Sequence, residues 1–277
     1  MSIGNDGAAL HGVSVTVPTG PYRRDPAVRV LHDVSLTIPA GAVTALVGES
    51  GCGKSMAAAA LCGLLPPGAR FDGEVRIGAH PFSGRLQDLA ALRGTTIGLV
   101  PQSPATGFTP VRTLGSQLDE VVRVLDGPRS SADLCRLVEL PGSALDRYPH
   151  ELSGGMAQRA ALAAALAGAP EVLIADEPTS ALDPDLADHV WGLLARVAAE
   201  GAAVLVITHD LAALRRSEAC RSIAVMRRGR MLGQRENEEE WRRLGSSPHS
   251  ASARPPENTS VELTDEDHLT EFFREGW

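Results

Sequence analysis

The octapeptide GESGCGKS, residues 48–55, constrains the fold of this chain more than any other stretch. It matches the pattern G-x-x-x-x-G-K-S, and it stands between a continuous apolar run, residues 42–48, and an alanine-rich segment, residues 54–64. An apolar run that ends in glycine is typical of a strand buried on both faces of a parallel sheet. The loop glycines let the backbone curl so that successive N–H groups point at one anion, and the following helix adds the positive end of its dipole. The stretch therefore predicts a strand, a phosphate-binding loop and a helix, in that order.

The residues of this loop have separate expected roles. Lys54 would contact the β- and γ-phosphates of a nucleotide, and the Ser55 hydroxyl would ligate magnesium. Cys52 is either an inert variable position or, because it lies near a helix N-terminus, an unusually acidic thiol. The alternative for the whole stretch is a glycine-rich turn that contains a lysine by chance. The predicted phosphate-binding residues are Gly48, Glu49, Ser50, Gly51, Cys52, Gly53, Lys54 and Ser55.

The order of strand and then helix returns later in the chain. EVLIAD, residues 171–176, precedes a helical pattern at residues 184–200, and AAVLVITHD, residues 202–210, precedes the helical pattern LAALRRS. Before the loop, residues 13–17 alternate in polarity and residues 28–38 are rich in β-branched side chains, which is typical of strands. Alternating buried strands and helices favour a parallel α/β sheet.

The remaining segments differ from this core in composition. Residues 102–150 are polar and helical in pattern and contain several Gly and Pro breakers, which indicates a helical subdomain inserted into the α/β core. After Gln234 the chain is charged and then rich in Ser, Pro and Ala, which is typical of a flexible linker with short helices. We therefore expect one α/β unit over residues 1–234, with the helical subdomain at about 102–159, and an acidic, partly flexible tail over residues 235–277.

Composition narrows the class of protein. The 277 residues carry a formal net charge of −8, and much of the negative charge lies after Arg235, so binding to nucleic-acid phosphates is not expected. The four cysteines lack the close spacing of zinc or iron–sulfur ligands, which predicts free thiols in a reducing cytoplasm. The N-terminal residues show no signal-peptide pattern, and the apolar stretches are shorter than the about 20 residues that a spanning helix needs. We expect a chain that does not cross a membrane by itself.

Two carboxylates and a histidine stand at the ends of the later strands. Asp176 and Glu177 follow the apolar run VLIA, at the strand end where ligands bind in parallel sheets. Asp176 would hold magnesium and Glu177 would polarise a water for attack on a γ-phosphate, whereas the alternative is that both merely cap the next helix. His209 follows another apolar strand. Alone it would more often be a satisfied core or loop histidine, but beside Lys54 and Glu177 a γ-phosphate contact is favoured.

A second glycine-rich stretch, LSGGMAQR at residues 152–159, opens a predicted helix. GESGCGKS, VPQSP, LSGGMAQR, IADEP, SALD and His209, taken in this order, resemble the motifs of the ATP-binding subunit of an ABC (ATP-binding cassette) transporter. LSGGMAQR resembles the signature motif of that family, with Met156 where many members carry glutamine, and Gln102 of VPQSP resembles its Q-loop glutamine. The resemblance covers about residues 10–234.

The resemblance implies an α/β fold, namely a P-loop NTPase (RecA-like) core with an antiparallel β subdomain and an inserted α-helical subdomain. It implies ATP and Mg²⁺ as ligands. Tyr22 is the aromatic residue available to stack on adenine, and a plain surface tyrosine is the alternative. The resemblance assigns catalysis to Glu177, His209 and Gln102, magnesium binding to Ser55, Gln102 and Asp176, and contact with a partner's ATP to Ser153, Gly154 and Gly155.

The resemblance also implies partner chains. In this family the signature motif closes over the γ-phosphate bound to a second subunit, so that two ATP molecules are sandwiched in a head-to-tail dimer. The expected partners are a second ABC ATPase subunit, identical or related, two transmembrane permease subunits and, indirectly, an extracytoplasmic substrate-binding protein. The implied location is peripheral, on the cytoplasmic face of the cell membrane.

Longer stretches are most similar to the ATPases of peptide and nickel importers, among them PQSPATGFTPVRTLGSQLDEVV and YPHELSGGMAQR. Phe108 and Thr109 stand where that subfamily more often has leucine and asparagine, and the tail lacks clustered cysteines for an iron–sulfur site. We expect a motor subunit that hydrolyses ATP for the import of di- or oligopeptides. The alternatives are a nickel or metal-chelate importer, an exporter motor, a non-catalytic regulatory cassette, and a soluble ABC ATPase in DNA repair or translation.

Overall fold

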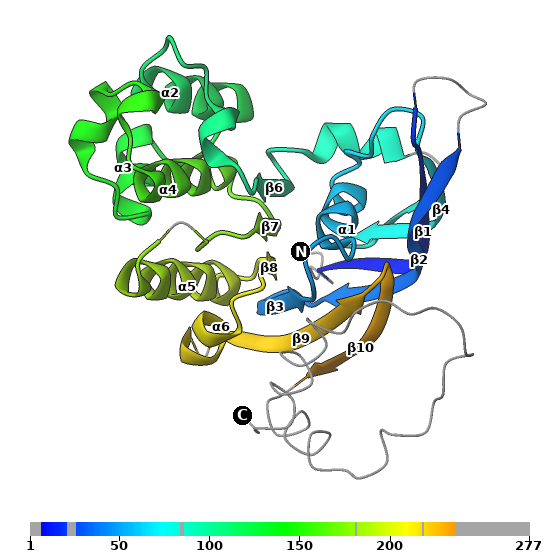
Figure 1. The fold of residues 1–277 in the computed structure, drawn as a ribbon. Helices are drawn as coiled ribbons and strands as arrows, with labels where there is room; N and C mark the ends of the chain where they lie inside the picture. Colours follow the sequence, from blue (N-terminus) through cyan, green and yellow to red (C-terminus); the bar gives the residue numbers. More distant parts are fainter. Residues whose placement is uncertain (1–6, 21–25, 84–85, 181, 218, 237–277) are drawn as a thin grey trace.

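The computed structural model describes residues 7–20, 26–83, 86–180, 182–217 and 219–236. Two sheets and two groups of helices make up this part of the chain (Figure 1). Tyr22 and the predicted flexible tail lie outside the described residues, apart from the last residues of the final strand.

A six-stranded sheet carries the residues predicted to bind phosphate. Its strand order is β10-β9-β3-β8-β7-β6, and the strands are parallel except for β10, which pairs antiparallel with β9. Leu46 of β3 and Asp176 of β7 both stand opposite Ile207 of β8. The carboxyl ends of these strands therefore meet at one edge of the sheet. The strands are β3 (Ala42–Val47), β6 (Ile97–Val100), β7 (Val172–Asp176), β8 (Ala203–Ile207), β9 (Cys220–Arg227) and β10 (Arg230–Glu236).

Successive side chains of this sheet enter two different cores. Val43 and Ala45 of β3 belong to the same cluster as Trp191 of helix α5 (Pro184–Ala199), whereas Leu46 belongs to the cluster of Leu61 in helix α1 (Lys54–Leu61). Because both faces are covered, all six residues of β3 are buried. The continuous apolar runs that predicted parallel strands have this physical origin, and the prediction of a parallel α/β sheet is confirmed.

A four-stranded antiparallel sheet, of order β2-β1-β4-β5, lies on the other side of α1 (Figure 1). Leu31, Val34, Leu36 and Ile38 of β2 are buried and alternate with more exposed residues, and they share a cluster with Leu61 of α1. Helix α1 is thus enclosed between the two sheets, which gives the chain a layered core. The strands are β1 (Ala8–Pro18), β2 (Ala27–Ile38), β4 (Arg70–Ile77) and β5 (His80–Ser83).

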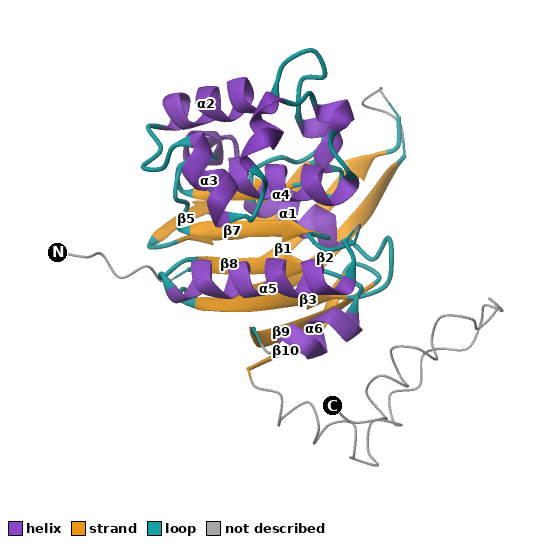
Figure 2. Cartoon of the chain, turned by 90° about the vertical axis from the view of Figure 1, so that its left-hand side faces the viewer, coloured by secondary structure: helices purple, strands orange, loops and turns teal. Residues whose placement is uncertain are grey.

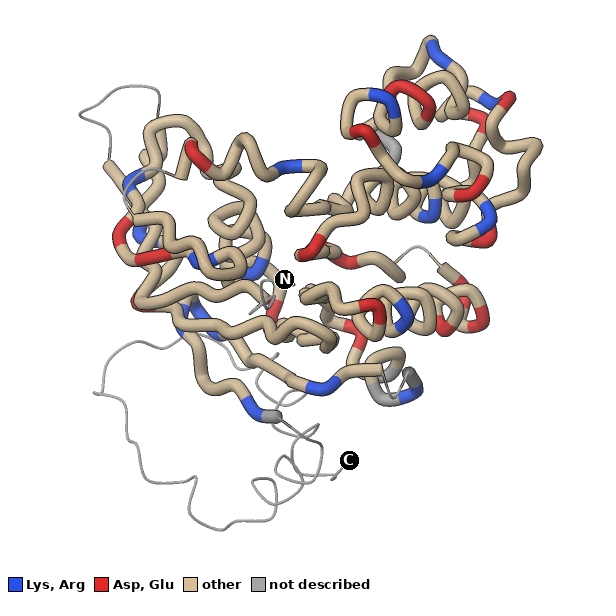
Figure 3. Tube along the Cα trace, turned by 180° about the vertical axis from the view of Figure 1, so that it is seen from behind, with Lys and Arg blue, Asp and Glu red and all other residues tan. Residues whose placement is uncertain are grey.

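The helices outside the sheets fall into two groups. Helices α5 and α6 cover the face of the parallel sheet opposite α1, and α2, α3 and α4 gather beside β6 (Figures 1 and 2). Figure 3 shows basic and acidic residues interspersed over the second group. Helices α2 and α3 lie within the segment predicted to be a helical subdomain, about residues 102–159, whereas α4 continues beyond it to Ala165. Its independence as a subdomain stays a prediction. The helices are α1 (Lys54–Leu61), α2 (Leu114–Leu125), α3 (Ser131–Leu137), α4 (Gly154–Ala165), α5 (Pro184–Ala199) and α6 (Leu211–Ser217), with short 3-10 turns at Leu86–Leu92, Pro104–Gly107, Gly142–Asp146 and Pro149–Glu151.

Some elements differ from the prediction. Helix α1 ends at Leu61 rather than at residue 64, because the chain turns at Gly63, where a Cβ atom would lie 2.4 Å from the carbonyl oxygen of Leu86. Strands β4, β5, β6, β9 and β10 were not predicted; β6 has only four residues and β4 carries charged side chains along its length. Within the described ranges, the helices are too short or too polar to cross a bilayer.

Candidate functional site

A hollow at the carboxyl edge of the parallel sheet gathers most of the predicted site residues. Its volume is about 500 Å³. The loop after β3, the end of β7 and the residues after β6 and β8 all open into it, as the strand register requires. Sequence reasoning missed Val30 and Met56, because neither apolar residue stands in a recognisable motif. The lining residues are Val30, Gly48, Glu49, Ser50, Gly51, Gly53, Lys54, Ser55, Met56, Gln102, Asp176, Glu177 and His209.

The loop between β3 and α1 holds its lysine against the backbone. Gly53, the N-cap residue of α1, has a φ of +108°, a conformation that residues other than glycine rarely adopt. The Lys54 Nζ atom donates to the carbonyl oxygens of Gly48, at 2.6 Å, and Glu49, at 2.8 Å. Lys54 is also the one lysine of the whole sequence. The amine therefore lies beside the curled backbone, where it can contact an anion bound by the loop N–H groups.

Cys52 differs from its neighbours in the loop. Its side chain is buried under the loop rather than in the hollow, and a Cβ atom on Gly48 would lie 2.9 Å from its Sγ atom. Burial raises the pKa of the Cys52 thiol, and this effect exceeds the lowering by the nearby Lys54. The structure therefore favours the inert position over the unusually acidic thiol.

The two carboxylates at the end of β7 are both buried. Burial is the main cause that raises the pKa of Asp176, and the charge of Glu177 adds to it, whereas a hydrogen bond with the Ser55 side chain and the charge of Lys54 lower it. These carboxylates do not cap the next helix. Asp183 has that role, because its side chain accepts the N–H of Leu186 at 3.0 Å.

Glu177 and His209 form a pair across neighbouring strands. His209 Nδ1 lies 2.6 Å from Glu177 Oε1. Glu177 is buried, while the His209 side chain is largely exposed. Glu177 has a φ of +54°, an uncommon conformation for a residue with a side chain, and its N–H donates to the carbonyl of Ile207 at 2.9 Å. The strand ladder thus continues one residue beyond β7 and holds the carboxylate next to the histidine.

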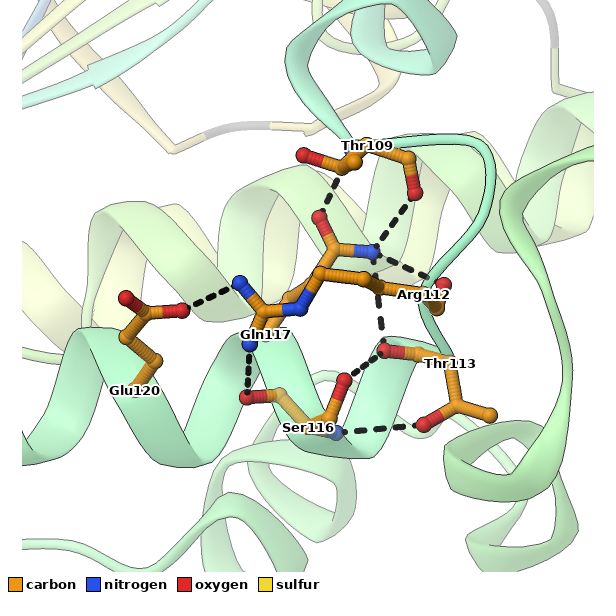
Figure 4. Close-up of polar contacts among 6 residues, drawn as sticks. All are labelled: Thr109, Arg112, Thr113, Ser116, Gln117 and Glu120. Atoms are coloured by element: carbon orange, nitrogen blue, oxygen red, sulfur yellow. Dashed lines mark hydrogen bonds and ion pairs between the residues drawn. The ribbon is translucent and has the colours of Figure 1, made fainter.

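The chain after Gln102 is fixed by a buried amide (Figure 4). The Gln117 Oε1 atom accepts the N–H of Thr109 at 2.7 Å. The Gln117 Nε2 atom donates to the carbonyl oxygens of Thr109, at 3.1 Å, and Arg112, at 3.0 Å. One side chain on α2 therefore secures the loop that joins the Gln102 segment to the α2–α4 group.

The glycine-rich stretch at residues 152–159 does not line the hollow. Ser153 is the N-cap of α4, and its hydroxyl oxygen accepts the N–H of Met156 at 3.3 Å. Ser153 and Gly154 are exposed, so the start of this helix faces away from the chain's own core. A Cβ atom on Gly155 would lie 3.1 Å from the side chains of Leu182 and Leu186.

A sequence model of the family described as ABC transporter matches residues 31–180, more than half of the chain. The chain belongs to the ABC transporter family. Among the relatives of this ABC protein is the probable peptide ABC transporter ATP-binding protein y4tR of Sinorhizobium fredii, 37% identical over 77% of the chain and 67% of the relative. Another is the dipeptide transport ATP-binding protein DppD of Escherichia coli, 38% identical over 69% of the chain and 62% of the relative.

The oligopeptide transport ATP-binding protein OppD of Mycobacterium tuberculosis is 40% identical over 69% of the chain but only 33% of its own length. The aligned part of the ABC chain thus spans from about a third to two thirds of these relatives. The fold of the chain is similar to that of the ATP-binding cassette MJ0796, a dimer in a post-hydrolysis state bound to ADP and Pi. The TM-score is 0.70 and the sequence identity is 28%, and the alignment covers 83% of this chain and 98% of that one. The predictions of family, of fold class and of an ABC ATPase cassette are confirmed.

Proposed function

We propose that this ABC cassette is the ATP-hydrolysing motor subunit of a membrane importer for di- or oligopeptides. The observation that carries the proposal is the hollow that brings Lys54, Asp176, Glu177 and His209 together at one strand edge. Its relatives are named as peptide, dipeptide and oligopeptide transport ATP-binding proteins, which supports the cargo class.

The loop after β3 would bind the phosphates of ATP. Its backbone N–H groups and the N-terminus of α1 supply a site for an anion, and Lys54 would exchange its bonds to loop carbonyls for bonds to the β- and γ-phosphates. The donor set also fits Mg²⁺, because Ser55, Asp176 and Gln102 all offer oxygen atoms, and the Ser55 and Asp176 side chains are already hydrogen-bonded to each other. When bound, the ion would neutralise charge on the phosphates.

Glu177 is proposed as the general base. A water oxygen forms a bond to the γ-phosphorus, the bond to the β,γ-bridging oxygen breaks, and the water proton passes to the Glu177 carboxylate. His209 would orient that carboxylate through Nδ1 and would donate from its other ring nitrogen to a γ-phosphate oxygen when protonated. The burial of Glu177 keeps bulk water from competing for the carboxylate.

The signature residues Ser153, Gly154 and Gly155 are proposed to serve a second cassette. They lie outside the hollow, at an exposed helix start, so they are available to the nucleotide of a partner chain. A head-to-tail dimer would then close around two ATP molecules. The dimeric state of the MJ0796 cassette supports this arrangement.

Transmembrane permease subunits are proposed to dock near the Gln102 segment. A mainly apolar hollow of about 390 Å³ lies there between β6, α2 and α4, and Phe108 and Gln117 are among its lining residues. Val111, in the loop that Gln117 secures, is 82% exposed. In this proposal the cassette would lie on the cytoplasmic face of the membrane, and a substrate-binding protein on the other side would select the cargo.

The unique lysine provides a direct test of the nucleotide site. An amine acylating reagent has one ε-amine to modify, that of Lys54, besides the N-terminal amine, so mass spectrometry reads the two separately. We expect Mg-ATP to protect Lys54 and leave the N-terminal amine unprotected. Equal acylation of Lys54 with and without saturating Mg-ATP would refute binding at this loop.

The transport partners need a second test. The Glu177→Gln chain is purified from its native membranes in mild detergent with ATP. Co-purification of polytopic membrane proteins and a second cassette is expected, and an associated binding protein would identify the cargo. Recovery from the soluble fraction alone, with ribosomes or nucleic acid, would refute the transport role.

A further inference from the structure

The turn between β9 and β10 contacts the phosphate loop through a backbone hydrogen bond. The Gly229 N–H donates to the Cys52 carbonyl at 2.8 Å, and the Gly229 carbonyl accepts the N–H of His32 at 2.8 Å. One residue of the turn therefore joins the phosphate loop to strand β2. The turn at 228–229, taken with the strand residues that flank it as residues 226–230, lies about 175 residues after the loop in sequence. It reaches the loop because β9 is the neighbour of β3 in the sheet.

The fit between these segments leaves no room for a side chain at Gly229. Its φ is +74°, and a Cβ atom would lie 2.2 Å from the Val30 carbonyl oxygen and 2.9 Å from the His32 Cδ2 atom. The other side of the contact is equally close, because a Cβ atom on Gly48 would lie 2.1 Å from the Met226 carbonyl oxygen. Backbone thus packs on backbone, a contact that transmits small displacements directly.

A pair of charges reinforces this contact at its outer edge. Arg227 Nε lies 3.9 Å from Glu49 Oε1. Both side chains are about one third exposed, so the pair by itself is weak. Glu49 lines the nucleotide hollow, however, and its carbonyl is one of the two that hold the Lys54 amine. The arginine therefore restrains the first half of the loop, and Gly229 restrains the second half.

We propose that the turn 226–230 is a brace that positions the phosphate loop for ATP, with Gly229 and Arg227 as positioning residues. The inference rests on the proposed function of the loop. A phosphate loop binds through backbone N–H groups, whose directions depend on the loop conformation rather than on side chains. Loss of the brace lets the loop relax, which weakens ATP binding and frees the Lys54 amine from the Gly48 and Glu49 carbonyls.

The test compares Gly229→Ala with Gly233→Ala. Gly233 lies further along, on β10, and a Cβ atom there meets open space, so that variant is the matched control. We expect the backbone strain of an added Cβ atom to raise the Kd for Mg-ATP about tenfold, which corresponds to about 1.4 kcal/mol. In the nucleotide-free protein, acylation of Lys54 is expected to become several-fold faster in Gly229→Ala, because the amine loses its carbonyl partners. Gly233→Ala is expected to match the wild type in both measurements.

The charge pair gives a second set of variants, which decides the question if Gly229→Ala does not fold. Arg227→Glu is expected to raise the Kd about threefold, Arg227→Lys to change it little, and the exchanged pair Glu49→Arg with Arg227→Glu to recover most of the loss. A folded Gly229→Ala variant in which the Kd for Mg-ATP and the acylation rate of Lys54 are both unchanged would overturn the brace. An exchanged pair that does not recover the Kd would also overturn it. In both cases the proposed ATP site would stand. A wild-type chain that binds no Mg-ATP would overturn the proposed function and the brace with it.

Discussion

Replacing Glu177 by glutamine should separate ATP binding from ATP hydrolysis in this cassette. Glutamine has the same shape, keeps the left-handed backbone at this position and still offers an oxygen to His209, so the local packing is preserved. What it loses is the ability to accept a proton. The other carboxylates that line the hollow are engaged elsewhere, since Asp176 is hydrogen-bonded to Ser55 and Glu49 lies beside Arg227.

The size of the effect follows from the role assigned to the carboxylate. A positioned general base contributes typically about 10²- to 10⁴-fold to a rate, and each factor of ten corresponds to about 1.36 kcal/mol, so the barrier should rise by about 3–5 kcal/mol. The upper part of this range is expected, because the described lining residues contain no free carboxylate that could replace Glu177. The Kd for Mg-ATP should stay within about threefold of the wild type, since Glu177 does not belong to the phosphate loop.

Phosphate release measured under single-turnover conditions gives the rate, and size-exclusion chromatography with ATP reports whether the unhydrolysed nucleotide traps a dimer. Glu171→Gln is the matched control, because Glu171 is an exposed glutamate directly before the start of β7, at the edge of the sheet opposite Glu177. Turnover in Glu177→Gln equal to that of Glu171→Gln would refute the role of Glu177 as base. Loss of turnover together with loss of ATP binding would refute the separation of the two steps.

Three further predictions concern other parts of the chain. Gly154→Ala should leave the thermal midpoint nearly unchanged, because Gly154 is exposed at the start of α4. The same change should lower ATPase activity about tenfold, because the added methyl group would obstruct a partner's nucleotide, and normal activity in a folded variant contradicts this. Gln117→Leu should lower the free energy of unfolding by about 2–3 kcal/mol, because the backbone groups of Thr109 and Arg112 lose their hydrogen-bond partner. Urea titration measures this change, and a value below about 0.5 kcal/mol would refute the role of Gln117 in fixing the loop. Burial raises the pKa of the Cys62 thiol to about 12, so about one thiol in 10⁴ is ionised at pH 8. The thiol should therefore resist alkylation at pH 8 and react faster as the pH rises. Rapid labelling of Cys62 in the folded protein at pH 8, measured by mass spectrometry, would contradict this.

Sequence patterns predicted the elements whose cause is local. The run at residues 42–48 is apolar because both faces of β3 are covered, and the β-branched residues at 28–38 suit the pleated surface of β2. The end of α1 was misjudged because the close approach of Gly63 to Leu86 involves a segment that is distant in sequence. The short strand β6 carries too few residues for periodicity to distinguish it from a loop.

Residue patterns alone predict a phosphate loop, an acidic strand end and a signature helix, because each depends on the conformational needs of neighbouring residues. Glycine stands where the backbone curls, apolar residues stand where a strand is buried, and serine stands where a helix begins. The contact of His209 with Glu177, the position of Val30 in the hollow and the hydrogen bond from Gly229 to Cys52 became visible only in the folded chain. These contacts depend on the order of strands in the sheet, which places β3 between β8 and β9. Strand order results from the packing of the whole core, and no local pattern of residues encodes it.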